Sequence, residues 1–254
     1  TLDASANISL STYGKHWIDN LTGHIIIDSL NVQNGSKQAI MEQMKLLVDN
    51  DIKNKKKHHR LQLQSDFVTA NISGIFQYTT LLNTAQRIIH GYVPSLVTAP
   101  KKINRQPNEL SFYAYFRQLE TISEVLDLEV SLPHYPTIKG YIDEQKEALE
   151  LQAYIPNINT DGTNIKDLTI ALNNPNEALD LSVYMYNCLP QNNPTAAKIG
   201  DVKAHINVKA QDDKIGLQIS LDNTDSVRNA GVINISSKIA RYADKPLFDI
   251  HVHP

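Results

Sequence analysis

Residues 149–155 read LELQAYI and residues 179–185 read LDLSVYM, and these two stretches decide the fold class. In both, every second residue is apolar, which is the spacing that places alternate side chains on one face of a β-strand. Most of the intervening residues are polar or aromatic. Each stretch therefore predicts a strand with one face for a core or a ligand and one face for water.

The same alternation recurs through most of the chain. It is found at residues 4–10, 25–27, 46–48, 61–63, 68–76, 138–142, 168–172, 202–208 and 215–221. Polar turn-forming residues separate several of these runs, at 143–146, 161–162, 173–176 and 211–214. Short polar turns connect antiparallel neighbours. The sequence thus predicts a mainly β protein, a long twisted antiparallel β-meander that is either an open, taco-like groove or a closed sandwich.

Two segments have helical spacing instead. Residues 79–92 carry apolar side chains three and four positions apart and end before Pro94, and residues 119–126 repeat the pattern over a shorter length. We expect these helices to plug the sheet or to separate its halves, because their apolar faces need a partner.

A weak internal repeat suggests two halves. Residues 23–28 (GHIIID) resemble residues 140–143 (GYID), and residues 61–63 (LQL) resemble residues 179–181 (LDL). We predict a first β-meander repeat at 1–118, with the helix at 79–92. The second, at 119–254, has the helix at 119–126 and is truncated at its C-terminus. A chance match is the alternative, because any two amphipathic strands look alike.

Composition excludes several kinds of partner. The chain has 254 residues, 41% apolar and 20% charged, with a net charge of −3, so bulk charge attracts neither nucleic acid nor anionic membranes. The single cysteine, Cys188, rules out an internal disulfide and reads as a half-buried structural thiol. No run approaches the ~18 apolar residues of a membrane span. The N-terminus has no leader pattern, so we expect an excised piece of a longer protein.

A family resemblance lies in the order of the strands. Residues 136–143 (PTIKGYID), 149–156 (LELQAYIP), 162–172 (GTNIKDLTIAL) and 179–183 (LDLSV) resemble the repeating unit of the TamB/AsmA-like family of repeating β-groove proteins. Residues 61–78 (LQLQSDFVTANISGIFQY) are similar to the same unit. The resemblance extends over roughly residues 20 to 254 and consists of a strand pattern, not a catalytic signature.

The resemblance implies a location and a role. Members of this family are anchored in the inner membrane of bacteria, cross the periplasm, and take part in phospholipid transport to the outer membrane and in outer-membrane protein assembly. It therefore implies a non-catalytic periplasmic segment without cofactor. Its implied partners are phospholipid acyl chains and an outer-membrane barrel assembly partner.

The apolar strand faces are the candidate site for lipid. We expect seven residues of the second half to share one continuous face: Leu149, Leu151, Ile155, Ile170, Leu172, Leu181 and Val183. An acyl chain needs only an apolar lining, since each buried methylene contributes ~0.8 kcal/mol. The same pattern would also build a sandwich with a dry core, and the alternative function is a periplasmic or surface β-sandwich for binding or adhesion.

The C-terminal residues 249–254 read DIHVHP and raise a third hypothesis. His251 and His253, two positions apart on a strand, could chelate a metal as in metal-dependent hydrolases. Such enzymes need further ligands on an α/β barrel, which the upstream alternation contradicts. We therefore expect a surface strand, no metal ligand and no enzyme.

A basic run at residues 53–60 (KNKKKHHR) could receive an anionic lipid head group. The simpler interpretation, which we favour, is a solvated hairpin loop between Val48 and Leu61.

Overall fold

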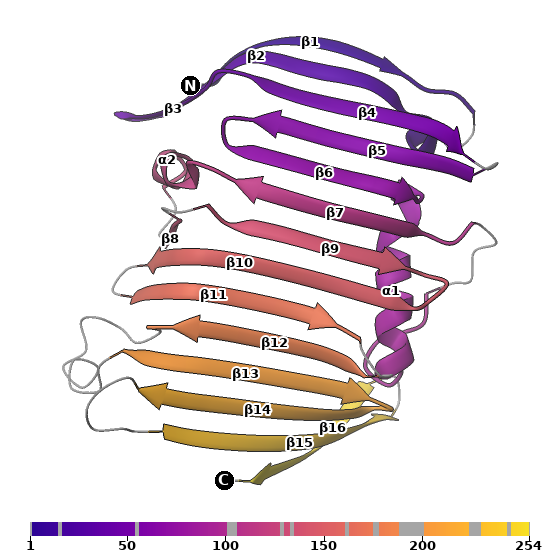
Figure 1. The fold of residues 1–254 in the computed structure, drawn as a ribbon, viewed down its shortest axis with the longest axis vertical. Coiled ribbons are helices and arrows are strands. Elements are labelled where there is room, and N and C mark those ends of the chain that lie inside the picture. Colours follow the sequence, from indigo (N-terminus) through magenta and orange to yellow (C-terminus); the bar gives the residue numbers. More distant parts are fainter. Residues whose placement is uncertain are drawn as a thin grey trace.

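The chain forms one open antiparallel β-sheet with two short helices (Figure 1). The computed structural model describes residues 2–14, 17–53, 56–100, 106–127, 130–132, 135–160, 163–174, 178–187, 201–223, 230–242 and 245–253. The strands run in chain order from the N-terminal edge to the C-terminal edge, as expected for a meander. The predicted mainly β, open antiparallel meander is confirmed.

The first strands form the N-terminal half of the sheet. They are β1 (Leu2–Ser11), β2 (Thr22–Asn34), β3 (Lys37–Met41), β4 (Met44–Lys53), β5 (Lys56–Ser65), β6 (Val68–Ile75) and β7 (Glu109–Phe116). The others are β8 (Val130–Ser131), β9 (Thr137–Asp143), β10 (Ala148–Thr160), β11 (Thr163–Asn173), β12 (Leu179–Tyr186), β13 (Val202–Gln211), β14 (Lys214–Asn223), β15 (Ala230–Tyr242) and β16 (Lys245–His253).

Fourteen strands follow one path, while β3 pairs only with β2 and β8 only with β10. All the pairings between described strands are antiparallel, from β1 with β2 to β15 with β16. Every described strand belongs to this one sheet. The alternative of a closed sandwich is therefore wrong for the described part of the chain, because a sandwich needs a second sheet facing the first.

Both predicted helices are present. Helix α1 (Leu81–Tyr92) follows the short 3₁₀ helix η2 (Tyr78–Thr80), and α2 (Leu119–Val125) is one residue shorter than expected. They do not separate the sheet into halves: β7 pairs directly with β9 across the predicted boundary at residue 118. Figure 1 shows α1 beside the strand ends on one side of the sheet and α2 at the opposite strand ends. Within the described residues, no helix is long and apolar enough to cross a membrane.

The division into repeats at 1–118 and 119–254 stays a prediction. The proposed matches relate β2 to β9, and β5 to β12, along one uninterrupted sheet. Between β2 and β5 the path contains only β4, whereas between β9 and β12 it contains β10 and β11. A repeat would therefore require an added strand in the second half.

Local chemistry explains one hairpin turn and one position within a strand. Asp212 and Asp213 have φ values of 51° and 58°, which is the left-handed geometry of a two-residue hairpin turn between β13 and β14. Gly140 lies opposite Phe112 on the neighbouring strand, and a Cβ at this position would collide with the Phe112 ring. A glycine is required there because the aromatic ring lies over its backbone.

The basic run at 53–60 corrects one expectation. Instead of a long solvated loop, residues 56–60 are already part of β5, paired with β4 from Lys56 opposite Lys53 onward. The alternation that starts at Leu61 extends backward through Lys57 and His59, which the sequence did not indicate because both residues are polar. The side chains of these two residues consequently share a strand face with Leu61.

Candidate functional site

One face of the sheet carries unbroken rows of apolar residues, and we call it the inner face. One row follows paired residues across β1 to β15: Ile8, Ile25, Leu46, Leu63, Ala70, Ala114, Ile138, Ala153, Ile170, Val183, Ile206, Ile219 and Ile233. The next row continues to β16: Leu10, Gly23, Val48, Leu61, Ile72, Phe112, Gly140, Leu151, Leu172, Leu181, Val208, Leu217, Ile235 and Val252. No polar side chain interrupts either row.

The seven predicted residues lie on this face. Leu151, Leu172 and Leu181 are neighbours in the second row, and Ile170 and Val183 are neighbours in the first. The remaining two extend the face in opposite directions along β10: Ile155 pairs with Leu168, and Leu149 pairs with Ile142. The expected alignment of the seven on one face is therefore present.

Their burial differs in a way that matters for a ligand. Leu149 is 7% exposed and belongs to the core, whereas the other six are only half-buried. At the two sheet edges the rows end on exposed residues, with Ile8 and Val252 each 62% exposed. The middle of the inner face thus carries apolar side chains that the protein covers incompletely.

Helix α1 covers one margin of the inner face. Val93, just after the helix, is buried against Ala210 and Ile239, with Ile89, Val97, Leu179 and Ile215 packed around them. Two hydrogen bonds of Asp213 secure this end: its N–H donates to the Tyr92 carbonyl, and its carboxylate accepts from Ser95 N–H at 2.8 Å. The covered margin is the principal core of this half of the molecule.

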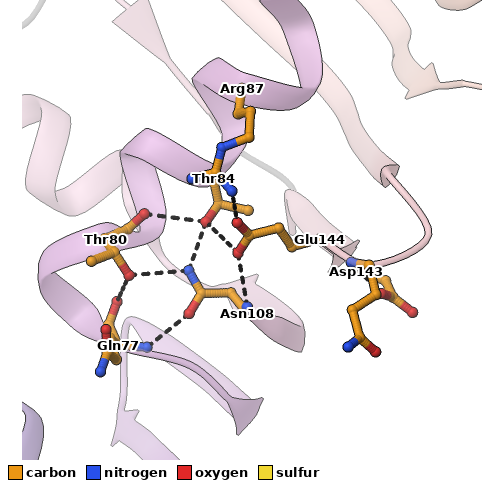
Figure 2. A network of polar contacts seen from close by, with 8 residues as sticks. Gln77, Thr80, Thr84, Arg87, Asn108, Asp143 and Glu144 are labelled. Atoms are coloured by element: carbon orange, nitrogen blue, oxygen red, sulfur yellow. Dashed lines mark hydrogen bonds and ion pairs between the residues drawn. The ribbon is translucent and has the colours of Figure 1, made fainter. Parts of the chain in front are cut away.

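A polar network fixes the other end of α1 (Figure 2). Asn108 is 1% exposed, and its side-chain amide donates to Thr84 Oγ1 at 2.7 Å and Thr80 Oγ1 at 3.2 Å while its oxygen accepts from Gln77 N–H at 3.0 Å. Glu144, in the turn after β9, accepts from Asn108 N–H at 2.9 Å. The Arg87 guanidinium forms an ion pair with the same carboxylate. Because every polar group of Asn108 has a partner, the network orients α1 against the sheet.

The opposite margin contains an apolar cavity of about 290 Å³. Val125 and Leu126 at the end of α2 form one wall. The other walls are Leu30, Val32, Ala39, Met41, Met44, Phe67 and Val68, with Ser65 as the one polar lining residue. Two of these, Met44 and Ser65, are paired and lie on the inner face beyond the first apolar row. The inner face is therefore continuous with a cavity that can hold apolar groups.

At the start of β5 the apolar inner face borders a group of polar residues, which we call the polar corner. We define it by Asp19 and Asn20 of the 3₁₀ helix η1 (Trp17–Asn20), by Lys57 and His59 of β5, and by Gln77. These residues contribute to the lining of a cavity of about 210 Å³, together with Ile75, Phe76, Gln106 and Pro107. Within it, Lys57 Nζ donates to the Asp19 carbonyl at 2.8 Å and to Asn20 Oδ1 at 2.6 Å.

His59 is the most constrained residue of this corner. It is 4% exposed, its ring packs against the rings of Phe76 and Tyr78 at centroid distances of 5.2 and 5.5 Å, and its Nδ1 has no hydrogen-bond partner among the described residues. Burial lowers the pKa of His59, Lys57 and His58 lower it further, and Asp19 opposes them. Burial in this corner therefore favours the uncharged ring.

The opposite, outer face is polar and aromatic. A row of paired residues across it reads Gln62, Asn71, Tyr113, Lys139, Gln152, Ala171, Ser182, Asn207, Gln218, Asn234 and His253. The outer face therefore has the composition of a surface that water covers. At one end of β4 to β6, residues of both faces line a cavity of about 370 Å³: Asp49, Asn50, Asp51, His58, His59, Arg60, Ser73 and Gly74.

Two histidine-containing pairs lie on the outer face. His205 Nε2 is 2.8 Å from Ser182 Oγ, a cross-strand contact that the sequence did not reveal because the residues are distant in the chain. His251 is exposed on β16 and lies 3.3 Å from Asp249 Oδ1 on the same strand. Among the described residues, no group of three or more histidine, cysteine, aspartate or glutamate residues could hold a metal ion. The prediction for Cys188 falls outside the described residues.

Sequence reasoning missed the residues that position the face. Asn108 and Glu144 carry no periodic or motif signal, because a single buried amide or carboxylate is recognisable only from its partners. Lys57 and His59 continue the spacing of Leu61 and Leu63, but residues 56–60 are all polar and so contain no alternation that would assign them to a face. Comparisons of the chain with protein-family models, curated proteins and solved structures gave no match.

Proposed function

We propose that this chain is a non-catalytic segment of a bacterial envelope protein whose inner face holds phospholipid acyl chains during transport between the inner and outer membranes. The observation that carries the proposal is the pair of unbroken apolar rows whose middle residues are only half-buried. In water such a surface is unfavourable, since uncovered apolar area costs about 25 cal/mol per Å². An acyl chain lying across the strands would remove that area from water.

The open sheet favours a lipid over a fixed core. A sandwich would cover both rows with a second sheet, whereas here α1 covers one margin and α2 borders the other. The apolar cavity beside α2 extends the same surface. Acyl chains suit this arrangement because they need length and apolar contact but no directional hydrogen bonds.

The cellular setting of the proposal comes from the resemblance to the TamB/AsmA-like family. A periplasmic location, an inner-membrane anchor elsewhere in the protein and a contribution to outer-membrane protein assembly follow from that resemblance. The inner face itself supports only the lipid part of the proposal.

Site-specific photo-crosslinking in the intact protein in cells tests the proposal. Crosslinkers at Leu151, Ile170 and Leu181 lie on the inner face and are expected to capture phospholipid, identified by mass spectrometry. Matched crosslinkers at the adjacent, outward-facing Gln152, Thr169 and Asp180 are expected to capture none. Equal capture by both sets, or capture by neither, would contradict the proposal and leave a scaffold role as the better account.

A further inference from the structure

The polar corner lies on the same strand face as the apolar rows. Along β5 the inner face reads Lys57, His59, Leu61 and Leu63, so that two polar residues are followed directly by members of both rows. Four residues of strand span about 13 Å, the separation of Lys57 from Leu61. The face therefore changes from polar to apolar within the length of one lipid molecule.

Lys57 supplies a positive charge at this corner. Its ammonium group has three N–H donors, and two of them reach the Asp19 carbonyl and the Asn20 side-chain oxygen, which are uncharged acceptors. The Tyr13 ring lies 5.5 Å from the same nitrogen. The ammonium group forms no ion pair among the described residues, and its third donor leaves capacity for an anionic oxygen.

Asp19 lines the same cavity, but other donors hold its carboxylate oxygens. Its side chain is buried, and its two carboxylate oxygens already accept hydrogen bonds from Tyr78 N–H at 2.8 Å and from Thr79 Oγ1 at 3.4 Å. A phosphate is an anion whose oxygens accept several charge-assisted hydrogen bonds.

We propose that the 210 Å³ cavity of the polar corner binds the phosphate of a phospholipid, with Lys57 as its cationic ligand and the acyl chains lying over Leu61, Leu63 and the apolar rows. This inference rests on the proposed lipid-binding function of the inner face. It adds a site for the head group and an orientation for the bound lipid, whose phosphate lies at the Lys57 end of the inner face of β5.

Binding of short-chain lipids to the purified chain tests this head-group site. The probes are dihexanoylphosphatidylglycerol below its critical micelle concentration, dihexanoylglycerol, which lacks the phosphate, and inorganic phosphate. Lys57→Met is expected to weaken phosphatidylglycerol binding about tenfold or more, the effect of losing a charge-assisted hydrogen bond. Binding of dihexanoylglycerol should not change. Lys57→Arg should retain most of the affinity, and circular dichroism verifies that each variant is folded.

The matched control is Lys139→Met. Lys139 is exposed on the outer face of β9, where it pairs with Tyr113 and Gln152, so its removal changes the net charge equally at a position outside the lining of the polar-corner cavity. Affinity for phosphatidylglycerol should be unchanged in this variant. An equal loss in the Lys139 and Lys57 variants would show a general charge effect and overturn the proposal.

Histidine NMR gives an independent readout. The charged and titratable groups near the His59 ring include Lys57, His58, Asp19 and Tyr78, and Asp49, Asp51 and Arg60 line the 370 Å³ cavity to which His59 also contributes. A bound phosphate would add a negative charge to them. Phosphatidylglycerol is therefore expected to raise the titration midpoint of His59, and dihexanoylglycerol is not. His205, on the outer face of β13, serves as the internal reference and should not shift.

The outcomes separate the two proposals. If both lipids bind with affinities that do not depend on Lys57, the head-group site is wrong while acyl binding to the inner face stands. If inorganic phosphate binds as tightly as phosphatidylglycerol and depends on Lys57, the corner is a site for free phosphate and not for a lipid. If neither lipid binds, the head-group proposal is wrong, and the crosslinking experiment decides the inner face separately.

Discussion

Asp143 shows how a single residue of this fold depends on its protonation state. It ends β9, is 3% exposed, and its carboxylate accepts hydrogen bonds from Gln145 N–H, Lys146 N–H and the Tyr141 hydroxyl at 3.0 to 3.1 Å. Lys146 Nζ lies 2.7 Å away. Burial alone raises the pKa of Asp143, but the hydrogen bonds and the Lys146 charge outweigh it and lower the pKa to about 2.

The low pKa of Asp143 predicts a loss of stability in acid. Below about pH 4 the unfolded chain takes up a proton before the folded chain does, so the stabilisation by this carboxylate is complete above pH 4 and is lost as the pH falls toward 2. Urea unfolding should show Asp143→Asn less stable than wild type at pH 6, with a difference that shrinks by pH 2.5. Glu150→Gln, an exposed carboxylate on the outer face, is the control. A difference for Asp143→Asn that does not vary with pH would contradict this account.

Helix α1 is held against the sheet at both of its ends. Its first turns contact the sheet through Asn108 and Glu144, and the residues after it pack on Ala210 and Ile239. Polar contacts therefore fix one end and apolar contacts the other. Such a combination orients a helix uniquely, because hydrogen bonds have direction and apolar packing does not.

We predict that Asn108→Ala destabilises the protein by about 1 to 3 kcal/mol, because it removes the buried amide that donates to Thr84 Oγ1 and Thr80 Oγ1 and leaves Gln77 N–H without its acceptor. Urea unfolding measures the loss, and amide hydrogen exchange should show faster exchange in α1 than in the strands. Leu82→Ala is the matched control on the same helix: Leu82 is 85% exposed, and its removal should change stability by less than about 0.5 kcal/mol. A loss of similar size in both variants would show that the network does not hold α1.

At the scale of the whole molecule, the sheet is one continuous surface with a covered margin and an uncovered middle. Val93 is 3% exposed under the covered margin, whereas Ile170 in the middle is half-buried. A charged side chain at position 93 would be buried away from water, whereas a charged side chain at position 170 could reach solvent. The two positions therefore distinguish a sealed core from an open face.

Accordingly, Val93→Asp should cost several kcal/mol and unfold much of the protein, since an unpaired buried charge is strongly unfavourable. Ile170→Asp should leave the circular dichroism spectrum unchanged, lower stability much less, and abolish lipid crosslinking at the neighbouring Leu181. Thermal unfolding of the two variants gives the comparison. Similar unfolding of both would indicate that the middle of the inner face is sealed as well.

Local spacing was sufficient for the sequence to determine most of the strands and their two faces, several turns and both helices, whereas β3, β7 and β15 were not predicted. The alternation in 149–155 and 179–185 assigns each side chain to a face, because successive residues of a strand point to opposite sides. Helical spacing in 79–92 likewise predicted α1 to within two residues at its start and correctly at its end. These features depend on residues that are close in the chain, and the sequence contains them directly.

Only the tertiary structure decided the register, the placement of the helices and the inward-facing polar residues. The two apolar rows are continuous because fourteen strands pair in register, which depends on every turn and bulge between them. Likewise, Asn108 and His59 gain their roles from partners brought close by folding, with Thr84 24 residues from Asn108. The physical reason is the same in each case: a buried polar group or a strand register is stabilised by contacts between distant segments, which local spacing does not encode.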